Sequence, residues 1–243
     1  MKYFLFLFKY IFSTLFAYLA FPKSCGICNE ISYEMPLCAK CRKKLLEFKI
    51  ENRCNLCGKE LFFEKDLCTK CREEKTLTKD FASLYPIFPY VLQKKYLLYS
   101  WKVANNREMV FFFAKVVFKV LNEKYPKIPI VPIPPRKNKI AEKGWDQIED
   151  LVFILERKYK IPVFRLLSRE NVLQQKKLSK EKRLTESKKS YKVIENLDLL
   201  TIPKEIVLLD DVITTGATLN SCKTALEELG IEKIHGVSLF SVP

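Results

Sequence analysis

The pattern of apolar and polar residues in the carboxyl-terminal half of the chain predicts alternating strands and helices. Residues 128–134 form a short apolar run with prolines, which is typical of a buried strand that leads straight into a loop. The apolar runs at 206–209 and 234–241 predict two further strands, and apolar residues at helix spacing in 146–159 and 219–229 predict two helices. This order of strand, helix, strand, helix, strand predicts a parallel α/β sheet, whose ligands bind at the carboxyl ends of its strands.

Three other segments complete the outline of the second half of the chain. Residues 101–126 predict one helix that ends near Pro126. Residues 136–143 form a basic loop. Residues 176–192 are rich in lysine with almost no apolar pattern, which predicts an exposed, mobile loop.

The first 24 residues form an apolar segment that Lys9 interrupts. Its longest uncharged run, Tyr10 to Pro22, is shorter than the roughly 20 residues that a membrane-spanning helix needs. We expect residues 1–24 to form an apolar helix that packs on the protein's own core. An interfacial contact with a membrane and a signal or spanning segment are the two alternatives. The chain is therefore expected to be cytoplasmic, with peripheral membrane contact left open.

Composition narrows the class of protein. The chain has 243 residues, 48% of them hydrophobic, which is enough for one large domain and a small one with a buried core. Its formal net charge is +15, and a balance this basic favours a polyanionic partner such as nucleic acid, a phosphorylated small molecule or an acidic membrane. A lysine-rich composition without functional meaning is the alternative.

Eight of the nine cysteines form four Cys-x-x-Cys pairs, the metal-ligand spacing of zinc ribbons. Each two-residue gap lets a tight turn aim both sulfur atoms at one ion. Disulfides need an oxidising compartment, for which nothing else in the sequence argues. We therefore expect residues 25–71 to form a double zinc ribbon with two structural Zn²⁺ sites. The expected ligands are Cys25, Cys28, Cys38, Cys41, Cys54, Cys57, Cys68 and Cys71.

The pairing of these ligands stays open at this point. Sequential sites, with the first four cysteines around one ion and the last four around the other, are simpler than an interleaved cross-brace. In either arrangement, four thiolates leave no open coordination position, so each site would be structural and not catalytic. Cys222 stands alone at a helix-spaced apolar position and is expected to be a core residue.

Two adjacent acids, Asp210 and Asp211, follow the predicted strand 206–209. Because neighbouring strand residues point to opposite sides, these carboxylates can spread over a diol or a metal at the strand's exit. The loop that follows carries hydroxyl groups, a glycine that lets the backbone approach a ligand, and the start of the predicted helix, all features that favour phosphate. Its residues are Thr214, Thr215, Gly216, Ala217 and Thr218.

This string resembles the signature by which type I phosphoribosyltransferases bind 5-phosphoribosyl 1-pyrophosphate (PRPP). The resemblance implies a phosphoribosyltransferase-like domain over residues 80–243, with a parallel sheet flanked by helices. It implies that Asp210 and Asp211 take the ribose hydroxyls, that residues 214–218 take the 5′-phosphate, and that Mg²⁺ accompanies the pyrophosphate. Arg136, and after it Lys137, would contact that pyrophosphate, and residues 176–192 could close over it as a hood.

The order of motifs narrows the resemblance further. A cysteine-pair module is followed by Val-Pro-Ile-Pro (131–134), Lys-Gly-Trp-Asp-Gln (143–147), the element 175–183 and the signature at 206–219. This order is similar to that of the ComF family, competence and DNA-uptake-associated proteins also typified by GntX. The family pattern usually has Arg-Gly-Phe-Asn-Gln at 143–147. Asp146 here therefore implies a negative charge near a site for phosphates.

Two functional interpretations follow from this resemblance. The first is a ComF-like protein that binds PRPP or a related ribose phosphate with Mg²⁺ and handles single-stranded DNA, in association with DNA-uptake proteins. The second is an active phosphoribosyltransferase in nucleotide or nucleoside metabolism, which transfers phosphoribosyl to an unidentified acceptor and releases pyrophosphate. No acceptor-side base is identified, so binding protein and enzyme both remain open.

Overall fold

The computed structural model describes residues 23–32, 36–48, 52–55, 57–58, 61–73, 81–89, 92–136, 139–169, 191–195 and 197–241. The segment 1–22, Lys137 and residues 170–190 lie outside this part of the chain. The predictions made for residues 1–22 of the apolar segment and for the element 175–183 therefore concern residues outside the described structure. The last two residues of the predicted helix 1–24, Lys23 and Ser24, form a strand instead.

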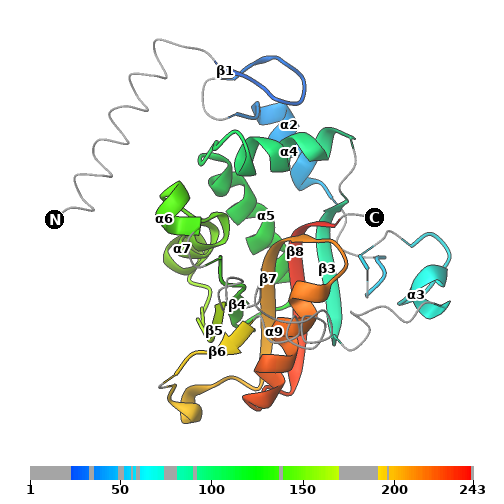
Figure 1. Cartoon of the computed structure of the whole chain (residues 1–243). Coiled ribbons are helices and arrows are strands. Elements are labelled where there is room, and N and C mark those ends of the chain that lie inside the picture. Colours follow the sequence, from blue (N-terminus) through cyan, green and yellow to red (C-terminus); the bar gives the residue numbers. More distant parts are fainter. Residues whose placement is uncertain are drawn as a thin grey trace, which may run out of the picture.

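The described elements fall into an amino-terminal part and a sheet with its helices (Figure 1). The amino-terminal part contains β1 Lys23–Ser24, β2 Ile31–Ser32, α2 Ala39–Leu46 and α3 Thr69–Glu73. The main strands are β3 Ser83–Pro89, β4 Ile130–Pro132, β7 Glu205–Ile213 and β8 Lys233–Ser241. The longer connections contain α4 Leu92–Lys102, α5 Met109–Lys124, α6 Lys139–Lys143, α7 Gln147–Tyr159, β5 Leu167–Arg169, β6 Tyr191–Val193, η3 Leu199–Thr201 and α9 Ala217–Glu228.

The main sheet has the strand order β3-β8-β7-β4, and each neighbouring pair is parallel. This confirms the predicted parallel α/β sheet. Alternate residues of β7 enter two different cores, as a central strand buried on both faces requires. Val207 and Leu209 pack in the core that α5 and α7 cover, whereas Ile206 and Leu208 pack in the core that α9 covers. Figure 1 shows α9 and α5 on opposite faces of the sheet.

Two predicted elements differ from the structure. Residues 101–126 do not form one helix, because α4 ends at Lys102 and α5 begins at Met109. Asn105 adopts a left-handed conformation with φ 55° between them, and asparagine tolerates that conformation better than most residues do. The predicted loop 136–143 contains the helix α6, which is too short to show a helical periodicity in the sequence.

Near the amino ends of the strands, a chain of hydrogen bonds joins β3, β8 and β7. The His235 ring bonds Ser83 Oγ through Nδ1 at 2.7 Å and Glu205 Oε1 through Nε2 at 2.8 Å. Ser83 Oγ also lies 2.8 Å from the Tyr125 hydroxyl. Ser83 and His235 are buried, so this chain satisfies polar groups in the core and gives the single histidine a structural role.

The two cysteine modules attach to the sheet differently. Three cysteines of the first module, Cys25, Cys38 and Cys41, belong to the same core cluster as the sheet. The second module has a small cluster of its own. Buried Arg53 joins that module to β3, because its guanidinium donates to the carbonyl oxygens of Gly58 and Ile87 at 3.3 and 3.2 Å.

Candidate ligand-binding site and metal centres

The eight paired cysteines gather into two groups in chain order, which excludes the interleaved arrangement. The sulfur atoms of each group all lie within 4.8 Å of one another. Cys28 and Cys38 are 3.6 Å apart at Sγ, and Cys57 and Cys68 are 3.7 Å apart. A tetrahedral zinc ion with Zn–S bonds of about 2.3 Å separates its sulfur ligands by about 3.8 Å. The donor set and the spacing therefore fit two structural zinc sites. The first group is Cys25, Cys28, Cys38 and Cys41, and the second is Cys54, Cys57, Cys68 and Cys71.

One thiol in each group is held in surroundings that disfavour its ionised form. Burial, and then hydrogen bonds with Cys57 and Cys68, raise the pKa of Cys71 above its ordinary value. Burial and the other thiols of the first group raise the pKa of Cys41 in the same way. Four sulfur atoms this close ionise together only around a positive ion. Zinc in these sites would therefore couple metal binding to folding in both modules.

The acid pair lies within β7, which extends past the acids to Ile213. The partner strand β4 ends earlier, with Pro132 opposite Leu209, so the acids lie beyond the edge of that strand. Asp210 is on the same face as Leu208, and Asp211 is on the same face as Leu209. The two carboxylates thus leave the strand on opposite sides, as the sequence predicts.

Asp210 faces the side of the sheet that α9 and β6 cover. Burial, and then the neighbouring Asp211 carboxylate, raise the pKa of Asp210 to about 8. One of its carboxylate oxygens, Oδ1, accepts a hydrogen bond of 2.7 Å from the backbone N–H of Asp211. The side chain can therefore hold a proton near neutral pH, and hydroxyl groups of a ligand can either donate to it or accept from it.

Asp211 faces the helices on the other side. Its Oδ2 atom lies 2.7 Å from Nζ of Lys102, the last residue of α4. The Asp211 side chain is 15% exposed and that of Lys102 is 41% exposed, so the ion pair is open to solvent on the lysine side. The sequence alone did not single out Lys102, because it lies more than a hundred residues before its partner.

The loop after β7 leads directly into α9. Thr214 and Thr215 are exposed, Thr218 is half-buried, and Gly216 has φ 79° in the left-handed region that favours glycine. Gly216 is also the N-cap of α9, with no side chain capping the helix. The first backbone N–H groups of α9 thus follow this loop directly, and a helix N-terminus is a place where phosphate can bind. One of them, the Ala217 N–H, donates to Thr215 Oγ1 at 3.4 Å, and the Thr218 side chain hydrogen-bonds Tyr191.

Of the two residues predicted to contact pyrophosphate, the structure describes only Arg136. Arg136 is exposed, four residues after β4 ends. Lys137 lies outside the described residues. Two lysines of the predicted basic loop lie in the same region. Lys139 Nζ is 2.6 Å from Asp146 Oδ2, and Lys143 Nζ donates to the carbonyl oxygen of Lys102 at 2.6 Å. Only the structure shows that Lys139 contacts Asp146 and that Lys143 contacts Lys102.

Asp146 has a different role from the one its charge suggests. It is buried, and it caps α7 by accepting from the backbone N–H groups of Ile148 and Glu149 at 2.9 and 3.1 Å. Its second oxygen pairs with Lys139. The negative charge that Asp146 brings to this region is therefore balanced by a lysine.

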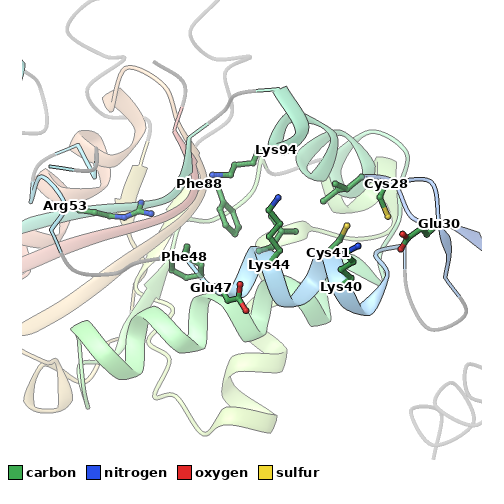
Figure 2. Close-up of a pocket in the computed structure, with 12 residues that line it drawn as sticks. Cys28, Glu30, Lys40, Cys41, Lys44, Glu47, Phe48, Arg53, Phe88 and Lys94 are labelled. Carbon is green, nitrogen blue, oxygen red and sulfur yellow. The ribbon is translucent and has the colours of Figure 1, made fainter. Parts of the chain in front are cut away.

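A cavity of about 490 Å³ lies between the first cysteine module, α4 and β3 (Figure 2). Figure 2 shows Lys44 of α2 and Lys94 of α4 extending beside Phe88. The Lys94 ammonium lies 5.5 Å from the centre of the Phe88 ring. The lining residues are Ile27, Cys28, Glu30, Lys40, Cys41, Lys44, Leu45, Glu47, Phe48, Arg53, Phe88 and Lys94. Basic side chains therefore outnumber acidic ones around this cavity.

Among the described residues, no helix has both the length and the apolar character needed to cross a membrane. The apolar amino-terminal segment is not among these residues.

Comparison with known proteins identifies the cysteine modules. Residues 16–78 match the family model of a double zinc ribbon domain. This match agrees with the two groups of four cysteines in the structure.

The chain is also similar to three competence proteins. It is 35% identical over 132 residues to Competence protein ComFC of Streptococcus pneumoniae, a match that covers 53% of this chain and 56% of that protein. It is 28% identical over 213 residues to Competence protein ComFC of Bacillus subtilis, covering 85% of this chain and 83% of that protein. It is 25% identical over 213 residues to Competence protein F of Haemophilus influenzae, covering 82% of this chain and 87% of that protein. The chain thus spans about half the length of the pneumococcal relative and most of the other two.

Proposed function

Because this chain belongs to the ComF family, whose relatives above are competence proteins, we propose that it binds PRPP or a related ribose phosphate with Mg²⁺. The observation that carries this proposal is the continuity of β7, the acid pair, the threonine loop and the start of α9. This stretch supports the proposal because two carboxylates and the first N–H groups of a helix lie at the carboxyl end of a parallel sheet, where such sheets bind ligands.

Each part of a ribose phosphate has a matching group in this arrangement. Asp210 and Asp211 would hydrogen-bond the vicinal hydroxyls of the sugar. Thr214, Thr215 and Thr218 with the N-terminus of α9 suit the 5′-phosphate. Mg²⁺ would be bound mainly by the pyrophosphate oxygens of the ligand, because this ion usually takes few protein ligands at such sites.

The first experiment measures the thermal shift of the zinc-loaded protein with PRPP and Mg²⁺. We expect stabilisation of the wild type and little or none of the Asp210→Asn/Asp211→Asn variant. Thr224→Val is a matched control, because Thr224 is exposed on the same helix α9 outside the loop. Equal stabilisation of wild type and acid variant, or none in either, would refute the proposal. If the wild type is stabilised as expected, a further assay separates enzyme from binding protein. Pyrophosphate release that depends on PRPP and an added base would identify an enzyme.

A second candidate function, the handling of single-stranded DNA, is supported by the cavity beside the first zinc module. Lys40 and Lys44 are exposed on α2, and Lys94 faces them from α4. Affinity for single strands comes largely from phosphate contacts, so lysines gathered around a groove favour such a ligand.

This second function is tested by the salt dependence of DNA binding. Replacing both Lys40 and Lys44 with glutamine should reduce the slope of log affinity against log salt by roughly 1.4, because each lost phosphate contact removes about 0.7 for a single strand. Lys115→Gln/Lys127→Gln removes the same charge from exposed positions elsewhere and should change the slope less. Equal slopes for the two double variants would exclude this cavity as the DNA site.

A further inference from the structure

Helix α4 carries an apolar stripe on the side that faces away from its core. Leu97 and Trp101 of this helix are buried, whereas Tyr96, Tyr99 and Val103 are 39%, 55% and 60% exposed. Val103 follows the helix directly, and its N–H donates to the Tyr99 carbonyl oxygen, so the helical turn continues through it. The three exposed residues recur at i, i+3 and i+7 and therefore share one face. We call Tyr96, Tyr99 and Val103 the α4 stripe.

The α4 stripe begins where the described chain begins. The ring of Tyr96 lies against the backbone of Gly26 and leaves no room for a Cβ atom there. Strand β1 starts at Lys23, and its partner β2 carries Ile31, which is 63% exposed. Figure 1 shows α4 next to β1 and α2 of the first cysteine module. Residues 1–22 are therefore joined to the described structure close to the α4 stripe.

The sequence of residues 1–22 suits such a surface. Its larger apolar side chains recur at helix spacing, at Phe12, Leu15, Phe16 and Leu19. Ser13 and Ala17 fall on the opposite side of the same predicted helix. A helix over residues 10–21 would be about 18 Å long at 1.5 Å per residue, close to the length of the 11-residue helix α4.

A second observation assigns part of this segment to the first cysteine module. The match to the double zinc ribbon family begins at residue 16, so the family model includes residues that precede β1. The module packs on α4, because Cys25 and Cys41 belong to the same core cluster as Leu97 and Trp101. The short connection to β1 also makes docking on α4 intramolecular, so little entropy is lost in bringing the two surfaces together.

We propose that residues 10–21 form a helix that docks on the α4 stripe and completes the first cysteine module. Contact between the two apolar faces removes both from water, which is the driving force for docking. The docked helix would also brace the end of α4, where Lys102 contacts Asp211. A membrane surface and a second copy of the chain are the competing occupants, and the experiments below distinguish them.

Hydrogen exchange of the full-length, zinc-loaded protein without lipid tests this inference. We expect the amides of residues 10–21 to exchange at least about tenfold more slowly than those of an unstructured chain. Tyr99→Glu/Val103→Glu should remove this protection, because docking would bury unpaired charges. Lys115→Glu changes the net charge by the same amount at an exposed position of α5 and should leave the protection intact. Zinc content and protection of the sheet confirm that each variant is folded.

A reciprocal test changes the segment and measures the stripe. Leu15→Glu/Leu19→Glu should increase the oxidation of Tyr99 by hydroxyl radicals about twofold or more, because an undocked segment leaves this side chain open to solvent. Ser13→Glu/Ala17→Glu is the matched control, since it places the same charges on the opposite side of the predicted helix. Equal oxidation of Tyr99 in the two double variants would overturn the proposal.

Three further outcomes would overturn it. The first is unprotected exchange of residues 10–21 in the wild type, or protection that survives in folded Tyr99→Glu/Val103→Glu. The second is protection that appears only with vesicles containing phosphatidylglycerol, which would assign the segment to a membrane surface. The third is protection that is lost on dilution together with a dimer seen by sedimentation, which would assign it to a second copy. None of these measurements involves PRPP, so the proposed function is tested separately.

Discussion

Asp210 and Asp211 are neighbours in the chain, yet only Asp211 contacts a lysine, because the two side chains leave β7 on opposite faces. Asp211 pairs with Lys102 on the side of α4. Asp210 faces α9 and β6, where Tyr191 and Cys222 are its titratable neighbours. One carboxylate is therefore balanced by a cation and the other is held in a site that disfavours its charge.

This difference predicts how Asp210 affects stability as pH changes. Its pKa of about 8 in the folded protein lies above the ordinary aspartate value of about 3.9. The folded state thus binds the proton more tightly than the unfolded state. The contribution of Asp210 to stability is complete below pH about 4 and is lost as pH rises toward about 8. Asp210→Asn should therefore stabilise the protein relative to wild type increasingly between about pH 4 and pH 8, with no further change above about pH 8.

Chemical unfolding of wild type and Asp210→Asn across this range measures the effect. Burial raises the pKa of Tyr191 to about 12 and that of Cys222 above its ordinary range, so these neighbours do not titrate in the same interval. A difference in unfolding free energy that does not change with pH would contradict the prediction.

Loss of the first zinc site should destabilise more of the protein than loss of the second. Cysteines of the first group share the core of the sheet, whereas the second group has a separate cluster. Cys41→Ser should lower the melting temperature of the whole protein, and Cys71→Ser should unfold the second module while leaving the sheet folded. Zinc content should fall from two ions to one in both variants. Hydrogen exchange shows which segments open, and equal loss of protection in the sheet would contradict the prediction.

Gly58 should be less replaceable than other glycines with positive φ. A Cβ atom there would lie 2.5 Å from Cδ of Pro86, in the strand that the second module contacts. Gly230 also has positive φ, but a Cβ atom at that position meets nothing within 4 Å. Both alanine variants carry a backbone cost of about 1 kcal/mol. Gly58→Ala should lose about 1–3 kcal/mol more, from steric conflict, in denaturant unfolding. Equal losses would show that the module shifts without cost.

Asp146 offers a test that separates its capping role from its charge. Asparagine caps helices as well as aspartate does, so Asp146→Asn should keep α7 intact, whereas Asp146→Ala should cost about 1 kcal/mol or more. Asp146→Asn also frees Lys139 from its carboxylate partner. Denaturant unfolding measures the stability of both variants. Equal losses for Asp146→Asn and Asp146→Ala would contradict the capping role.

Local patterns in the sequence predicted much of this architecture. The continuous apolar run before Asp210 fits a strand buried on both faces, and the regular Cys-x-x-Cys spacing fits two tetrahedral sites. Both signals are short-range, because strand burial and metal ligation at a turn depend on residues within a few positions of each other. The break between α4 and α5 was not predicted, although four consecutive polar residues, Asn105 to Glu108, lie there, because one polar turn also fits a continuous helix.

The sequence by itself determined the kinds of element, the cysteine ligands, and the acid pair with its threonine loop, because each is encoded in contiguous residues. Only the tertiary structure decided that the cysteines group in chain order, that Asp146 is neutralised by Lys139, and that Lys102 pairs with Asp211. These relationships join residues from different elements. Sheet order and helix packing fix them, and no local periodicity or spacing carries that information.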